Sequence, residues 1–230
     1  MLALFPDGFE EVERDGSTEL VVYTDAAGEE RVWHVFGGAH STDVEEGWED
    51  RWQTFHRPVE VGRLWIGPSW EQPATGAIAV VIDPGRAFGT GAHPTTRLCL
   101  RLLQQVEPAS LLDVGCGSGV LSIAGALLGF GPVLAVDVEP AAVETARANA
   151  EANRVQIDAR LVGSADALPA ASVAVVNISL AGVVSAAERI DAHTLIASGY
   201  LAADLPQPPG WALLDRIELD GWAADVFERG

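Results

Sequence analysis

The alternation of apolar strand-like runs with helical segments is the feature that most constrains how this chain folds. Five nearly apolar runs predict strands, at 110–115, 132–138, 156–163, 172–179 and 193–200. Three connecting segments have the length and spacing of helices, at 119–129, 140–153 and 181–190. Strands that are apolar on both faces are typical of a parallel sheet covered by helices on both sides. The pattern therefore predicts an α/β class, doubly wound, Rossmann-like sheet.

The last two predicted strands narrow this class. Residues 211–220 and 222–229 both read as strands, and only Gly221 separates them. A link this short joins antiparallel neighbours, because parallel strands need a long crossover. Ahead of the alternating region, 77–85 predicts a strand and 93–106 an amphipathic helix with Pro94 in its first turn. We expect a sheet that ends in an antiparallel hairpin.

The N-terminal part has a different pattern. Segments 19–25 and 30–37 predict a hairpin, 43–61 a helix ending near Pro58, and 62–70 a short strand with a turn. We expect two parts: residues 1–72 as a small α+β module and linker, and residues 73–230 as the main domain.

The charge of the chain limits its partners. The 230 residues carry a formal net charge of −19, and all 14 cationic side chains are arginine. Binding to a nucleic-acid backbone needs a positive surface, so direct nucleic-acid binding is not expected. An acidic surface attracts a basic protein partner. The alternative is a solvated acidic surface with no partner.

The sequence gives no signal for a disulfide framework, a metal site, secretion or a membrane span. Cys99 and Cys116 form no motif that predicts a disulfide framework, and the five histidines show no metal-ligand spacing. The first residues do not resemble a signal peptide, and no apolar run is long enough to span a membrane. We expect a cytoplasmic protein with no metal.

The stretch "DVGCGSG" predicts a cofactor loop. It places Gly115, Gly117 and Gly119 between a strand and a helix, where glycine permits positive φ and close approach to a ligand. The spacing is G-x-G-x-G, which differs from the dinucleotide pattern G-x-G-x-x-G. A tight strand–helix turn without a ligand is the structural alternative.

An acidic residue ends the next predicted strand. Ionised Asp137 only accepts hydrogen bonds, so it suits the two hydroxyls of a ribose. The alternative is a cap for the following helix, a role that Glu139, just before Pro140, fits better. Asp137 is therefore a candidate ribose ligand.

The glycine loop, the strand-end acid and the closing hairpin together resemble class I methyltransferases, which use S-adenosylmethionine. This resemblance places "GSADALP" at the end of the third strand, and Asp166 near the adenine amine of the cofactor. The alternative for Asp166 is a solvated turn.

A longer set of motifs resembles one family. "WIGPSWE", "DPGRAFGTGAHPTTRLCL", "LLDVGCGSGVLSIA", "AVDVEP", "VVNI" and "LDGWAADVFER" are similar, in this order, to the ribosomal protein L-eleven methyltransferase family. The likeness runs from about Gly62 to the C-terminus. It implies that Thr96, Gly115, Asp137 and Asn177 bind the cofactor, and that the substrate is a basic ribosomal protein.

The chain departs from the family in three places. The N-terminal module resembles a shortened form of the family's substrate-recognition domain. Residues 201–210 form a brief link where the family has a helix, and Ala92 stands where the family often has a bulkier polar residue.

The first glycine-rich loop gains a role from this resemblance. Unpaired N–H groups at a helix start attract a carboxylate, and the methionine part of the cofactor carries one. We expect Phe88, Gly89 and Thr90 to cover the methionine end, with Thr96 in the helix that follows. His93 either caps this helix or contacts the cofactor or the acceptor.

The sequence "NISL" after the fourth strand favours an aliphatic amine acceptor. It lacks the Pro-Pro-aromatic run typical of enzymes that methylate planar nitrogens. We expect the carbonyl of Asn177 to orient the amine, although a strand-end turn is the structural alternative.

The predicted activity is methyl transfer to a lysine side chain or N-terminal amine of the ribosomal protein. The alternatives are another protein or small amine as acceptor, or a docking protein that binds the cofactor without catalysis.

Overall fold

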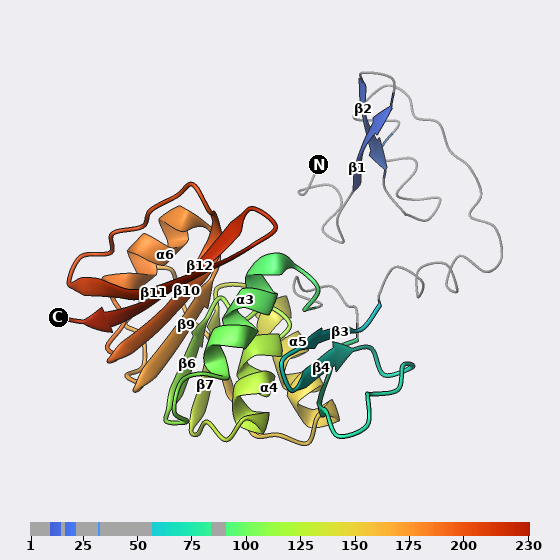
Figure 1. The fold of residues 1–230 in the computed structure, drawn as a ribbon, viewed down its shortest axis with the longest axis horizontal. Coiled ribbons are helices and arrows are strands. Elements are labelled where there is room, and N and C mark those ends of the chain that lie inside the picture. Colours follow the sequence, from blue (N-terminus) through green and yellow to red (C-terminus); the bar gives the residue numbers. More distant parts are fainter. Residues whose placement is uncertain (1–9, 15–16, 22–31, 33–56, 84–90) are drawn as a thin grey trace. The chain divides into compact units, whose positions relative to one another are not determined.

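A computed structural model describes residues 10–14, 17–21, 32, 57–83 and 91–230. The chain divides into two compact units, Met1–Trp52 and Gln53–Gly230. In the first unit, β1 (Glu10–Arg14) pairs antiparallel with β2 (Ser17–Val21), drawn in blue in Figure 1.

The structure describes only part of the predicted hairpin. Segment 19–25 overlaps β2, whose described partner is β1. The two strands flank the dipeptide Asp15-Gly16, which is the composition that a two-residue hairpin turn favours. Of the segment 30–37, only Val32 is described, and it is helical. Most of the predicted helix 43–61 lies outside the described residues, and its last three residues form a strand.

The second unit contains a seven-stranded sheet with the predicted topology (Figure 1). The strand order is β11-β12-β10-β9-β6-β7-β8. Its parallel strands are β6 (Leu111–Val114), β7 (Val133–Asp137), β8 (Asp158–Leu161), β9 (Val173–Asn177) and β10 (Thr194–Leu201). Strand β12 (Trp222–Arg229) pairs antiparallel with both β10 and β11 (Trp211–Leu219). The doubly wound class and the closing antiparallel hairpin are confirmed.

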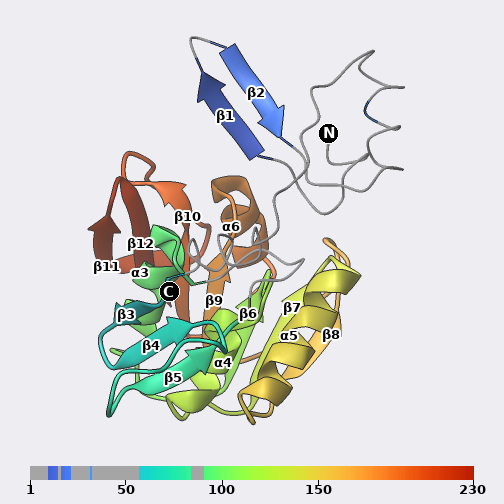
Figure 2. The same ribbon diagram turned by 90° about the vertical axis from the view of Figure 1, so that its right-hand side faces the viewer.

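Helices cover both faces of this sheet. On one face lie α3 (Pro94–Leu103), α4 (Val120–Leu127) and α5 (Pro140–Ala152), and on the other lies α6 (Leu180–Ala187) (Figure 2). Each face has its own apolar core. Leu98 and Ile123 belong to the core under α3 and α4, and Val183 belongs to the core under α6. These cores explain why the central strands are apolar on both faces.

A three-stranded sheet packs onto the same unit. It consists of β3 (Val59–Val61), β4 (Leu64–Gly67) and β5 (Ile78–Val81) in that order. Leu64 and Ile66 are buried in the core under α3 and α4. The compact unit therefore begins at Gln53, ahead of the predicted division at 72/73, because β4 and β5 share one sheet and one core.

Side-chain amides tie this small sheet to two helices. Gln104, at the end of α3, donates to the Val61 carbonyl (2.9 Å) and accepts from the Arg63 N–H (3.0 Å). Asn153, at the end of α5, accepts from the Val81 N–H (2.8 Å) and donates to the Val81 carbonyl (2.6 Å). The Gln104 bonds hold β3 and the turn after it, and the Asn153 bonds hold β5, the strand that leads into the first glycine-rich loop.

Candidate functional site

Several of the predicted site residues that the structure describes lie where the parallel strands end. The chain runs outward in opposite directions from β6, through β7 to β8 and through β9 to β10. In open α/β sheets, ligands bind beyond the carboxyl ends of the strands at such a switch point. Gly115 follows β6, while Asp137 and Asn177 end the two neighbouring strands.

The glycine loop has the backbone geometry expected for it. Gly115, Gly117 and Gly119 have φ values of +76°, +52° and +79°, a region that residues with a Cβ rarely adopt. Gly119 is also the N-cap position of α4, and a Cβ there would lie 3.0 Å from the Cβ of Ala146 on α5. Glycine therefore serves both the turn and the close packing of two helices.

Asp137 connects the loop to the next helix. Its side chain is 9% exposed, and its two oxygens accept from the backbone N–H groups of Gly117 (2.9 Å) and Glu139 (3.0 Å). Glu139 occupies the predicted N-cap position of α5, but its side chain makes no capping bond. The carboxylate of Asp137 thus holds the glycine loop at the carboxyl end of β7.

Thr96 and Asn177 meet across 81 positions of sequence. The Nδ2 atom of Asn177 donates to Oγ1 of Thr96 at 3.2 Å. Thr96 is buried in the first turn of α3, and Asn177 is partly exposed. This contact joins the helix after the first glycine-rich loop to the strand that carries the predicted acceptor-side motif.

His93 caps helix α3. Its Nδ1 accepts from the Thr95 N–H (3.3 Å) and lies 2.7 Å from the Thr95 hydroxyl oxygen. Its ring packs edge-on against Trp222, with centroids 4.8 Å apart. Partial burial lowers the pKa of this imidazole, which favours the neutral form that a cap requires. Capping is therefore one role of His93, while contact with the cofactor or acceptor stays a prediction.

Among the remaining predicted residues, only Asp166 lies within the described ranges. The Asp166 carboxylate accepts from the Gly163 N–H at 2.7 Å within its own exposed turn, which fits the structural alternative. Phe88, Gly89 and Thr90 lie outside the described residues. The described residues on either side of that segment lie close to β4 and the turn after it. Asp83 accepts from the Ser69 N–H (2.7 Å), and at Gly91 a Cβ would lie 2.5 Å from the Cγ2 of Ile66.

The structure adds residues that sequence reasoning missed. Val138 and Leu161 are each 55% exposed, next to Asp137 in the chain and opposite it in the register of β8. In the sequence, the available signal was an apolar side chain beside the acid that ends a strand.

Asp113, buried one residue before the end of β6, accepts from the Ser122 N–H (3.1 Å) and hydroxyl (2.6 Å). Asn149 of α5 donates to the Ser118 carbonyl at 2.8 Å. These bonds brace the glycine loop.

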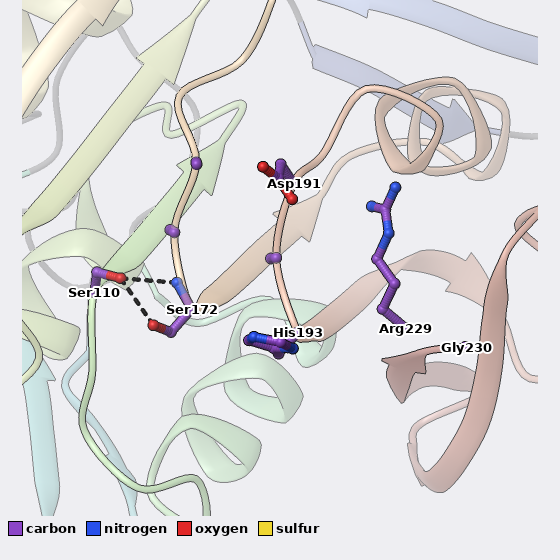
Figure 3. Close-up of a pocket in the computed structure, with 9 residues that line it drawn as sticks. Ser110, Ser172, Asp191, His193, Arg229 and Gly230 are labelled. Carbon is purple, nitrogen blue, oxygen red and sulfur yellow. Dashed lines mark hydrogen bonds between the residues drawn. The ribbon is translucent and has the colours of Figure 1, made fainter.

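A separate cavity lies at the other end of the sheet, where the parallel strands begin (Figure 3). It has a volume of about 510 Å³, and Ser110, Ser172 and His193, which line it, each precede a strand. Ser110 and Ser172 are hydrogen-bonded to each other at 3.1 Å. None of the predicted site residues lines this cavity.

Three further observations concern the described ranges alone. No helix there is long and apolar enough to cross a membrane. No group of three His, Cys, Asp or Glu side chains in that part of the chain lies close enough to hold a metal ion. Cys99 and Cys116 are both buried free thiols.

Known proteins resemble this chain in sequence and in fold. A family model described as "Ribosomal protein L11 methyltransferase (PrmA)" matches residues 17–204. A ribosomal protein L11 methyltransferase of Symbiobacterium thermophilum is 41% identical over 197 residues, which are 78% of this chain and 65% of that protein. One from Dechloromonas aromatica is 54% identical over 116 residues, 49% of this chain and 39% of that protein.

A solved structure agrees with these matches. The crystal structure of a ribosomal protein L11 methylase from Lactobacillus delbrueckii subsp. bulgaricus has a TM-score of 0.68 and 26% identity, covering 76% of this chain and 99% of that one. The chain spans less than two thirds of the length of the curated relatives named above. Since the family model matches most of its residues, the chain belongs to the ribosomal protein L11 methyltransferase family.

Proposed function

We propose that this chain transfers methyl groups from S-adenosylmethionine to amino groups of ribosomal protein L11, at a lysine side chain or the N-terminal amine. The observation that carries the proposal is the hydrogen bond between Asn177 and Thr96. This bond brings together the end of β9, which carries the acceptor-side motif, and the start of α3, which follows the first glycine-rich loop. Both then lie next to the glycine loop after β6. In this reading the two glycine-rich loops serve a single site.

The residues present fit S-adenosylmethionine. Asp137 offers carboxylate oxygens for a ribose, and the three loop glycines allow close backbone approach. Val138 and Leu161 offer exposed apolar surface beside that carboxylate, which suits a flat adenine ring. The start of α3 offers the positive end of a helix to the methionine carboxylate.

The chemistry asks little of a catalytic base. When bound, S-adenosylmethionine supplies an electrophilic methyl group next to a positively charged sulfur. A lysine amine with a pKa of about 10.4 is only about 0.1% neutral near pH 7.4, which costs roughly 4 kcal/mol. Desolvation and a nearby positive charge both lower such a pKa. With Nδ2 of Asn177 donating to Thr96, the Oδ1 atom of the same amide can accept from the amine and orient it for in-line transfer.

The charge of the chain supports a basic protein substrate. A net charge of −19 favours encounter with a basic partner such as a ribosomal protein. The relatives described above are named for methylation of ribosomal protein L11. A substrate of this kind places the activity in the cytoplasm.

The test uses methyl-labelled S-adenosylmethionine, the purified protein and unmethylated ribosomal proteins, with Asp137→Ala as the control. Because the chain contains no lysine, label on a lysine belongs to the substrate and not to the enzyme. We expect label on L11 alone, lost in the control. Label on another protein or a small amine would change the substrate. Cofactor affinity without any transfer would instead support the non-catalytic docking alternative.

A further inference from the structure

Ile178, the first residue after β9, is enclosed by three glycines from three different parts of the fold. Gly115 belongs to the glycine loop after β6, Gly182 to the first turn of α6, and Gly199 to β10. Gly182 follows Ile178 by four residues, whereas Gly115 and Gly199 come from other elements, and all three lie against Ile178. It also directly follows Asn177.

The contacts are close enough to exclude a side chain at each position. A Cβ at Gly115 would lie 2.5 Å from the Cγ2 of Ile178, and a Cβ at Gly182 would lie 2.6 Å from its Cδ1. At Gly199 a Cβ would lie 1.4 Å from the Ile178 carbonyl oxygen. Both branches of the side chain and the backbone of Ile178 are therefore held by separate elements.

The contact at Gly199 explains an irregularity in the sheet. The pairing of β10 with β12 shifts between Ser198 and Tyr200, so that Gly199 has no partner in the register. Gly199 has a φ of +102°, a conformation that favours glycine. The β-bulge makes room for the backbone after β9 and holds it against β10.

The contact at Gly115 reaches the cofactor loop directly. The Cγ2 of Ile178 faces the backbone of Gly115, where no side chain intervenes to absorb a displacement. The Gly115 N–H bonds to the Val136 carbonyl at 2.8 Å, one residue before Asp137. A shift of Ile178 would therefore move the loop backbone relative to the Asn177 amide.

We propose that Ile178 is a positioning residue, which sets the separation between the cofactor loop and the amide of Asn177. This inference rests on the proposed methyl transfer. This positioning role depends on the β-branch of Ile178, because Cγ2 is bonded directly to Cβ and contacts Gly115. An ordinary apolar core residue would depend on volume, whereas this role depends on the position of one methyl group.

Ile178→Leu tests the role, because it keeps the number of carbons and removes Cγ2. The matched control is Ile190→Leu, since Ile190 is buried in the core that Ile178 packs against. The measurements are kcat and KM for methylation of L11, the Kd of S-adenosylhomocysteine by calorimetry, and the unfolding midpoint of each variant. We expect Ile178→Leu to lower kcat at least tenfold and to raise Kd at least threefold relative to Ile190→Leu, with similar unfolding midpoints.

A conservative variant completes the design. Ile178→Val keeps Cγ2 and removes only Cδ1, so we expect it to recover most of the kcat and Kd lost in Ile178→Leu. Equal kcat and Kd for Ile178→Leu and Ile190→Leu would overturn the role. If the wild-type protein binds S-adenosylhomocysteine but methylates nothing, the proposed function fails. The comparison of Kd still decides the positioning role, and equal values would overturn it.

Discussion

At the scale of single residues, Asp137 has one observed role and one proposed role. Its carboxylate holds the Gly117 and Glu139 N–H groups, and we propose that it also binds the ribose of the cofactor. Asp137→Ala removes both roles. We expect it to weaken cofactor binding by about 1.5–3 kcal/mol, the range for hydrogen bonds to a charged group. Calorimetric titration with S-adenosylmethionine measures this change, and unchanged affinity would contradict the ribose assignment.

Asp137→Asn serves as the control for the loop itself. Its amide oxygen can still accept one backbone N–H, so the loop keeps part of its support. We expect it to unfold at a higher denaturant concentration than Asp137→Ala while still binding the cofactor more weakly than the wild type.

The hydrogen bond between Asn177 and Thr96 is tested by changing either partner. Thr96→Val removes the hydroxyl at nearly constant volume, and Thr96→Ser keeps it. If the bond orients the acceptor amine, Asn177→Ala and Thr96→Val each lower kcat by about tenfold, or roughly 1.4 kcal/mol in barrier height. Thr96→Ser should retain more activity than Thr96→Val. Full turnover in Asn177→Ala with unchanged cofactor affinity would exclude the orienting role.

At the scale of elements, Asp113 joins β6 to the first turn of α4. Burial raises the pKa of this carboxyl to about 7, and the hydrogen bonds from Ser122 oppose the rise. The folded state therefore binds a proton that the unfolded state releases near pH 4. Between about pH 4 and pH 7, this group makes the protein less stable as the pH rises, and the effect levels off above pH 7.

Asp113→Asn separates this charge from the packing. Its amide oxygen can still accept from Ser122, and it does not ionise. We expect the unfolding free energy of the wild type, relative to Asp113→Asn, to fall between pH 5 and pH 7 by at most about 1.4 kcal/mol per pH unit. Urea unfolding of both proteins at several pH values measures the difference. A constant difference would mean that Asp113 is ionised throughout this range.

At the scale of the whole molecule, the chain forms two compact units, and the described site lies in the second. We expect a fragment of residues 53–230 to unfold cooperatively and to bind S-adenosylhomocysteine with the affinity of the full chain. Methylation of L11 should fall at least tenfold, since the first unit makes up most of the predicted substrate-recognition module, residues 1–72. Weaker cofactor binding by the fragment would show that residues 1–52 contribute to the cofactor site. Unchanged methylation would remove the first unit from substrate recognition.

The predictions from sequence succeeded where the contacts are local, that is, between residues close together in the chain. The glycine loop, the strand-end Asp137 and the Pro94 helix start depend on neighbouring residues, so their positions were readable from spacing. The pairing of β1 with β2 was not predicted because the signal of Asp15-Gly16 was not used, and the predicted partner segment 30–37 lies almost wholly outside the described residues. The pairing of β4 with β5 across the predicted division at 72/73 joins segments that sequence spacing alone does not connect, and that division stays a prediction.

The sequence by itself determined the doubly wound sheet, its antiparallel end and the family of the chain. Periodicity, glycine spacing and link length are properties of local chain geometry. Only the tertiary structure decided which residues meet. Thr96 reaches Asn177 across 81 positions, and Gly115 and Gly199, from two other parts of the sheet, lie against Ile178. Such contacts depend on strand order and on the packing of both sheet faces, and no local pattern encodes the distance between two side chains.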